Sequence, residues 1–144
     1  MITPVSETRR GGGRPSHPLE LEARELMTPG VVSITEDATL HQVYRALLAH
    51  GVHALLVVGR HGGRPLGWVT ARGLLDWLDE DELLACARDA ITHDPVAIEP
   101  GASGREALVA LSQPGITHLL VQRAPDVLPE GVISTLDLVP ADFD

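Results

Sequence analysis

Two stretches of the chain show the same order of hydrophobic and polar positions. Each opens with a short apolar segment, Val31 to Ile34 and then Val96 to Ile98, which predicts a strand. A helical pattern follows, and then an apolar run, ALLVV or HLLVQ, that is too short for a helix and predicts a buried strand. After a turn rich in Gly and Pro, a third strand is expected to open at Gly67 or Gly131.

The middle and the end of each stretch predict helices. Thr39 with Gln42, and Ser103 with Glu106, have the spacing of a capping box at a helix start. A short second helix is expected at the hydroxyl residue that ends the third strand, Thr70 or Ser134. The order β-α-β-β-α is therefore predicted twice.

The chain is an internal duplication. When it is aligned with itself so that Gly51 falls on Gly115, 15 of the 53 positions from Ala23 to Leu75 are identical to their counterparts, and no gap is needed. Gly51 and Gly115 each stand where a glycine is expected to end a helix.

The predicted fold class is α+β, a tandem pair of β-α-β-β-α repeats. We expect a disordered tail over 1–16, a first repeat over 17–78 and a second over 79–144. One repeat alone would leave an apolar sheet face exposed to water. This favours packing of the two repeats sheet to sheet with pseudo-twofold symmetry. Two equivalent clefts are then expected, near the Thr70 and Ser134 turns.

Composition narrows the function classes. The net charge of −9 disfavours a nucleic-acid partner, and all eleven basic residues are arginine. No apolar run is long enough for a membrane span, and the N-terminus lacks the apolar region of a signal peptide, so a cytoplasmic protein without a membrane partner is expected. No nucleophile, acid–base or metal-ligand constellation stands out, which argues against an enzyme and predicts no metal site and no required cofactor.

The stretch GVISTLDLV, residues 131–139, carries the strongest candidate chemistry. Ser134 can offer a hydroxyl to a phosphate oxygen, and Asp137 can accept hydrogen bonds from two adjacent ribose hydroxyls. The same spacing is equally typical of a helix cap, Ser134, followed by a surface carboxylate. The first repeat keeps this frame in GWVTARGLL but has Gly73 in place of the aspartate.

These motifs, taken twice in the same order, resemble the CBS domain, named for cystathionine β-synthase. The resemblance spans residues 20 to 140 and corresponds to one tandem pair, a Bateman module. It rests on MTPGVVSITEDATLHQVYRALLAHGVHALLVV with GRPLGWVTARGLLDWL, and on ITHDPVAIEPGASGREALVALSQPGITHLLVQ with GVISTLDLV. The resemblance implies a regulatory binding module rather than an enzyme, and a homodimer.

The resemblance also implies a ligand and its residues. The expected ligand contains adenosine: AMP, ADP, ATP or S-adenosylmethionine. The ribose and phosphate would be bound by Asp137, Ser134 and Thr135. The adenine would be held by the partner repeat, through Val32, Val52 and His53.

The second cleft is expected to be degenerate. It lacks the aspartate. The residues that it would use are Thr70, Val96, Thr117 and His118. One competent cleft is therefore predicted. The alternative that stays open is a degenerate pair that binds no nucleotide and acts as a dimerisation module or as a docking surface for an unidentified protein.

Overall fold

The computed structural model describes residues 17–61, 63–79 and 84–140, so the predicted tail, residues 1–16, lies outside the described residues. The first half contains the 3₁₀ helix η1 (Pro18–Glu20), α1 (Ala23–Leu26), β1 (Thr28–Pro29), β2 (Ser33–Thr35), α2 (Leu40–His50), β3 (Ala54–Val58), β4 (Pro65–Thr70) and η2 (Gly73–Trp77). The second half contains η4 (Ala87–Ala90), β5 (Ala97–Ile98), α3 (Gly104–Leu111), β6 (His118–Val121), β7 (Gly131–Ser134) and η5 (Thr135–Leu138). The fold class is α+β, as predicted.

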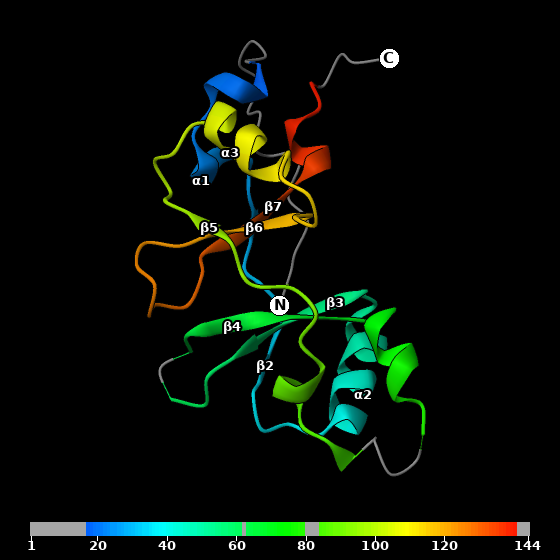
Figure 1. The fold of residues 1–144 in the computed structure, drawn as a ribbon. Helices are drawn as coiled ribbons and strands as arrows, with labels where there is room; N and C mark the ends of the chain where they lie inside the picture. Colours follow the sequence, from blue (N-terminus) through cyan, green and yellow to red (C-terminus); the bar gives the residue numbers. More distant parts are fainter. Residues whose placement is uncertain (1–16, 62, 80–83, 141–144) are drawn as a thin grey trace. The chain divides into compact units, whose positions relative to one another are not determined.

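The described residues form two compact units (Figure 1). Unit 1 consists of Val31–Pro95 with Pro125–Leu128. Unit 2 consists of residues 17–30, 96–124 and 129–140. The N-terminal segment of each expected repeat, up to Gly30 in the first and up to Pro95 in the second, therefore belongs to the unit built on the other repeat. The expected boundaries, 17–78 and 79–144, do not coincide with the units.

Backbone hydrogen bonds explain this exchange of segments. The Ala23 N–H of α1 donates to the Ala102 carbonyl, just before α3, at 2.7 Å. At the position that corresponds to Ala23 in the duplication, the Ala87 N–H of η4 donates to the Ala38 carbonyl, just before α2, also at 2.7 Å. Such short helices are unstable in isolation, so each docks where its buried alanine and its free amides find partners.

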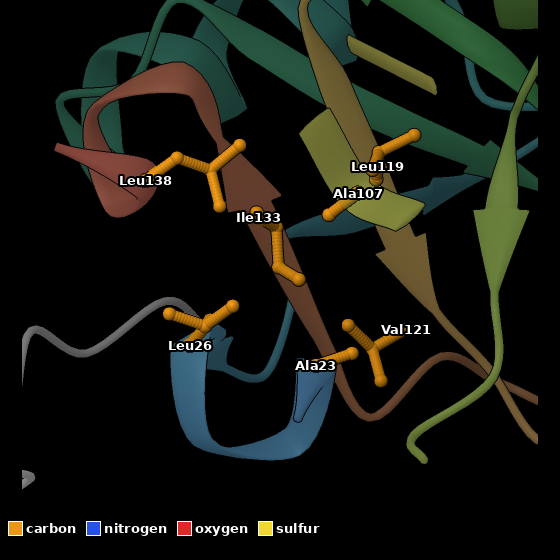
Figure 2. Packing of buried hydrophobic residues seen from close by; sticks show 7 residues of the cluster. All are labelled: Ala23, Leu26, Ala107, Leu119, Val121, Ile133 and Leu138. Carbon is orange, nitrogen blue, oxygen red and sulfur yellow. The ribbon is translucent and has the colours of Figure 1, made fainter. Parts of the chain in front are cut away.

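Unit 2 contains a sheet with strand order β1-β7-β6-β5, in which β5 and β6 are parallel and the other pairs antiparallel. Helices α1 and α3 cover one face of this sheet (Figure 1). Figure 2 shows the α1 side chains turned towards strands β6 and β7, with α3 and η5 closing the cluster. The buried members of this core are Ala23, Leu26, Ala107, Leu119, Val121, Ile133 and Leu138.

Unit 1 repeats the plan with strand order β2-β3-β4, again with a parallel first pair and an antiparallel second pair. The segment Thr92–His93 extends it, because His93 forms a bridge to Trp68 of β4. This bridge corresponds to the pairing of β1 with β7 in unit 2. Both units are thus completed by the N-terminal segment of the other repeat.

The helix starts follow the predicted capping boxes. The Thr39 hydroxyl accepts from the Gln42 N–H at 3.1 Å, and the Gln42 side chain accepts from the Thr39 N–H at 2.9 Å. Ser103 and Glu106 make the same pair of bonds at 3.1 and 3.0 Å. The sequence signal for both helix starts is therefore confirmed.

The predicted helix end is right in the first repeat and wrong in the second. Gly51 caps α2 in the left-handed conformation with φ +64°. In contrast, α3 ends at Leu111, well before Gly115. Pro114 has no N–H to continue the helical hydrogen bonds and disfavours helical geometry at the residue before it, so the glycine is left in a separate turn.

Three further boundaries move by one to three positions. The first strands begin at Ser33 and Ala97, after the predicted starts at Val31 and Val96. The helix expected at Thr70 begins at Gly73, although the Thr70 hydroxyl still accepts from the Gly73 N–H at 2.9 Å.

Candidate functional site

The candidate site of unit 2 lies at the turn between β7 and η5. Ser134 ends the strand, is the N-cap of η5 and is half-buried, and Asp137 follows one turn later. The Ser134 N–H donates to Asp137 Oδ2 at 2.8 Å, and the Ser134 hydroxyl lies 3.4 Å from the same oxygen. The turn therefore holds a hydroxyl and a carboxylate side by side, with the exposed Thr135 between them in sequence.

His118 belongs to the same cluster. It is paired directly opposite Ser134 in the β6–β7 ladder, so the two side chains lie on the same face of the sheet. Burial lowers the pKa of His118 below 6.5, and the negative charge of Asp137 partly opposes this shift. His118 Nδ1 lies 2.9 Å from the Thr117 hydroxyl.

The structure gives Asp137 a role in the fold as well. Its Oδ2 accepts the N-cap amide of η5, as the Asp89 carboxylate accepts the Cys86 N–H of η4 at 2.9 Å. The Asp137 carboxylate therefore takes part in the cap of η5 together with Ser134, and its binding of a ligand stays a prediction.

Unit 1 has the corresponding turn without the histidine and the carboxylate. Ala54 pairs with Thr70 where His118 pairs with Ser134, and Gly73 stands where Asp137 stands. The alignment of the two repeats already places Ala54 on His118, a signal that sequence reasoning missed when it grouped His118 with Thr70. The histidine and the carboxylate occur together in unit 2, and both are replaced in unit 1.

The remaining predicted site residues divide between the units. Val32, Val52 and His53 are in unit 1, where the His53 carbonyl accepts from the Ala71 N–H, just after Thr70, at 2.8 Å. Val96 and Thr117 are in unit 2, and the Val96 carbonyl accepts from the Leu120 N–H at 2.9 Å. The structure thus brings Ser134, Asp137, Thr117 and His118 together, and Thr70 with His53.

Within residues 17–61, 63–79 and 84–140, no group of three or more His, Cys, Asp or Glu side chains could hold a metal ion. The same residues contain no helix that is long and apolar enough to cross a membrane.

Residues 23–80 match the family model of the CBS domain. Among solved structures, the chain is similar to the CBS domain of the bacterial CNNM/CorC family Mg²⁺ transporter in complex with ATP, with a TM-score of 0.75, 23% identity, and coverage of 85% of this chain and 87% of that one. It is also similar to a putative acetoin utilization protein (AcuB) from Vibrio cholerae, with a TM-score of 0.69, 22% identity, and coverage of 83% and 87%.

A third similar structure is the CBS domain of a CBS domain containing membrane protein from Sphaerobacter thermophilus, with a TM-score of 0.69, 21% identity, and coverage of 84% and 87%. No curated protein matches the chain. Residues 23–80 therefore resemble a CBS domain, and the described chain has the fold of the CBS-domain structures that it matches. Domains of this family are generally regulatory rather than catalytic.

Proposed function

We propose that this chain is a regulatory, non-enzymatic module that binds an adenosine-containing ligand at the Ser134–Asp137 turn of unit 2. The observation that carries the proposal is the carboxylate of Asp137 beside the half-buried Ser134 hydroxyl, with His118 paired opposite Ser134 in the strand ladder. The ATP complex of a CBS domain with the same fold supports the choice of ligand class.

The chemistry of the turn suits a ribose. A carboxylate accepts hydrogen bonds from both of two adjacent hydroxyls, and such charge-assisted bonds are about twice as strong as neutral ones. Because the Ser134 N–H already orients Asp137, little side-chain entropy remains to be lost when a ribose binds. The candidates are AMP, ADP, ATP and S-adenosylmethionine.

Calorimetric titration with these four compounds tests the proposal. At least one compound should bind the wild-type chain. Asp137→Ala should lower the affinity for that compound roughly 10- to 100-fold, since hydrogen bonds to a charged group contribute about 1.5–3 kcal/mol. Failure of all four to bind at millimolar concentrations, or unchanged affinity in Asp137→Ala, contradicts the proposal.

The helix cap requires a control, because Asp137→Ala also removes the acceptor for the Ser134 N–H. Asp89→Ala removes the equivalent acceptor for the Cys86 N–H of η4. Each change should destabilise the fold by about 1 kcal/mol. Only Asp137→Ala should lower the affinity for the ligand. Asp137→Asn should restore the helix cap without restoring full affinity.

A second candidate function is a dimerisation or protein-docking module without a nucleotide. It is favoured by exposed apolar side chains on three elements: Tyr44 and Leu48 of α2, Leu108 and Val109 of α3, and Leu136 of η5, which is 81% exposed. Light scattering on the calorimetry samples separates the two candidates. A homodimer that forms equally well with and without every nucleotide, and whose melting temperature no nucleotide raises, favours the second.

A further inference from the structure

The turn of unit 1 differs from that of unit 2 in more than the absence of a carboxylate. A Cβ added at Gly73 would lie 3.0 Å from Thr92 Cγ2 and 3.1 Å from Thr70 Oγ1. Both separations are tighter than ordinary van der Waals contact, so any side chain at position 73 requires a neighbour to move. The backbone of Gly73 has no positive φ, so its conformation does not itself demand glycine.

Thr92 is held in place by its own hydrogen bonds. Its N–H donates to the Trp68 carbonyl at 3.0 Å, and its hydroxyl lies 2.8 Å from His93 Nδ1 and 3.5 Å from the Trp68 carbonyl. His93 is in turn fixed by the Trp68 N–H, which donates to its carbonyl at 2.9 Å. With the hydroxyl engaged, the Thr92 methyl group is directed at Gly73.

We infer that the Thr92 methyl group occupies the carboxylate position of unit 1, so that the chain binds one adenosine ligand and not two. The number of ligands bound per chain rests on the proposed function, whereas the contact between the Thr92 methyl group and position 73 does not. The first carbon of an aspartate introduced at position 73 would already be crowded by the Thr92 methyl group and the Thr70 hydroxyl. Loss of the aspartate in the first repeat is therefore not reversible by a single substitution.

A double-mutant cycle tests the contact without any ligand. Gly73→Ala should lower the melting temperature by several degrees, and Thr92→Ser, which removes the methyl group and keeps the hydroxyl, should cancel most of that loss. Thr28→Ser is the matched control, because Thr28 holds the position in the first repeat that Thr92 holds in the second. Additive effects of Gly73→Ala and Thr92→Ser, or an equal rescue by Thr28→Ser, would overturn the inference.

Calorimetric stoichiometry then tests the consequence. The wild-type chain and Gly73→Asp should each bind one nucleotide per chain, whereas Gly73→Asp with Thr92→Ser should bind two. A second ligand bound by Gly73→Asp alone, or only one bound by the double variant, overturns the blocking role of Thr92. Absence of binding by the wild-type chain contradicts the proposed function instead. The double-mutant cycle of melting temperatures still tests the contact between Gly73 and Thr92.

Discussion

At the scale of single residues, the two repeats differ most where chemistry is concentrated. The His118 and Asp137 pair of unit 2 is replaced by Ala54 and Gly73, while the hydroxyl at Ser134 or Thr70 is kept in both. The hydroxyl serves the turn itself, since Thr70 accepts from the Gly73 N–H at 2.9 Å. The hydroxyl that the turn needs is therefore present in both repeats, whereas the histidine and the aspartate occur only in the second.

The half-buried His118 predicts a loss of stability in acid. Because its pKa lies below 6.5 in the folded chain, the unfolded chain takes up the proton first as the pH falls. The free energy of unfolding should therefore decrease from about pH 6.5 down to the folded pKa, and melting temperatures from about pH 7.5 to 5 would show it. His118→Gln should flatten this part of the profile, and an unchanged profile would contradict the assignment.

Asp137 modulates the same effect. Its negative charge raises the pKa of His118 and so offsets part of the shift caused by burial. Asp137→Asn should therefore lower that pKa further, and the acid-induced loss of stability should grow. A smaller loss in this variant would contradict the electrostatic coupling.

At the scale of elements, short helices are stabilised by caps and by close docking rather than by length. Each of η4 and η5 has an aspartate that accepts the N-cap amide. The short helix η1 packs on α3, where Gly104 leaves room for the η1 backbone: an added Cβ would collide with the Pro18 carbonyl oxygen and lie 2.9 Å from Leu19 Cα. Close approach of two backbones is the reason for glycine at this position.

Gly104→Ala should therefore separate η1 from α3. We expect a destabilisation of about 1–3 kcal/mol, since a rigid backbone and not a flexible side chain must move. Gly101→Ala is the matched control, because its Cβ would meet only Arg24 Nη2 at an ordinary 3.5 Å. Urea unfolding measures both variants, and equal stability of the two would show that the close contact is unimportant.

At the scale of the whole molecule, the exchange of segments makes the repeats depend on each other. The segment with α1 and β1 begins the first repeat but contributes to the core of unit 2, and the segment with η4 and Thr92–His93 begins the second repeat but completes unit 1. A single repeat excised at its sequence boundaries would therefore lack part of its own core and carry part of another.

Leu26→Ala tests this dependence. Leu26 is 2% exposed in the core of unit 2, and its truncation should cost about 2–5 kcal/mol. Hydrogen exchange should show the loss of protection in β6, which is distant in sequence, more than in β2, which follows soon after Leu26. Val43→Ala in α2 should show the reverse, and a loss confined to β2 and β3 after Leu26→Ala would contradict the exchange.

The sequence by itself determined the duplication, the order of elements and both major helix starts. These features depend on local patterns: strand and helix periodicity, and capping boxes such as Thr39 with Gln42 that form within a single helical turn. It also singled out Ser134 and Asp137 as neighbours, because one helical turn brings them together. The early end of α3 was predictable in principle, since Pro114 is a local signal.

Only the tertiary structure decided which segments complete which unit. The partners of Ala23 and Ala87 are distant in sequence, and no periodicity encodes such pairings. The same holds for His118, which joins Asp137 through strand pairing, and for Thr92, which reaches Gly73 across a bridge from β4. Long-range contacts depend on complementary surfaces, and these arise only when the whole chain has folded.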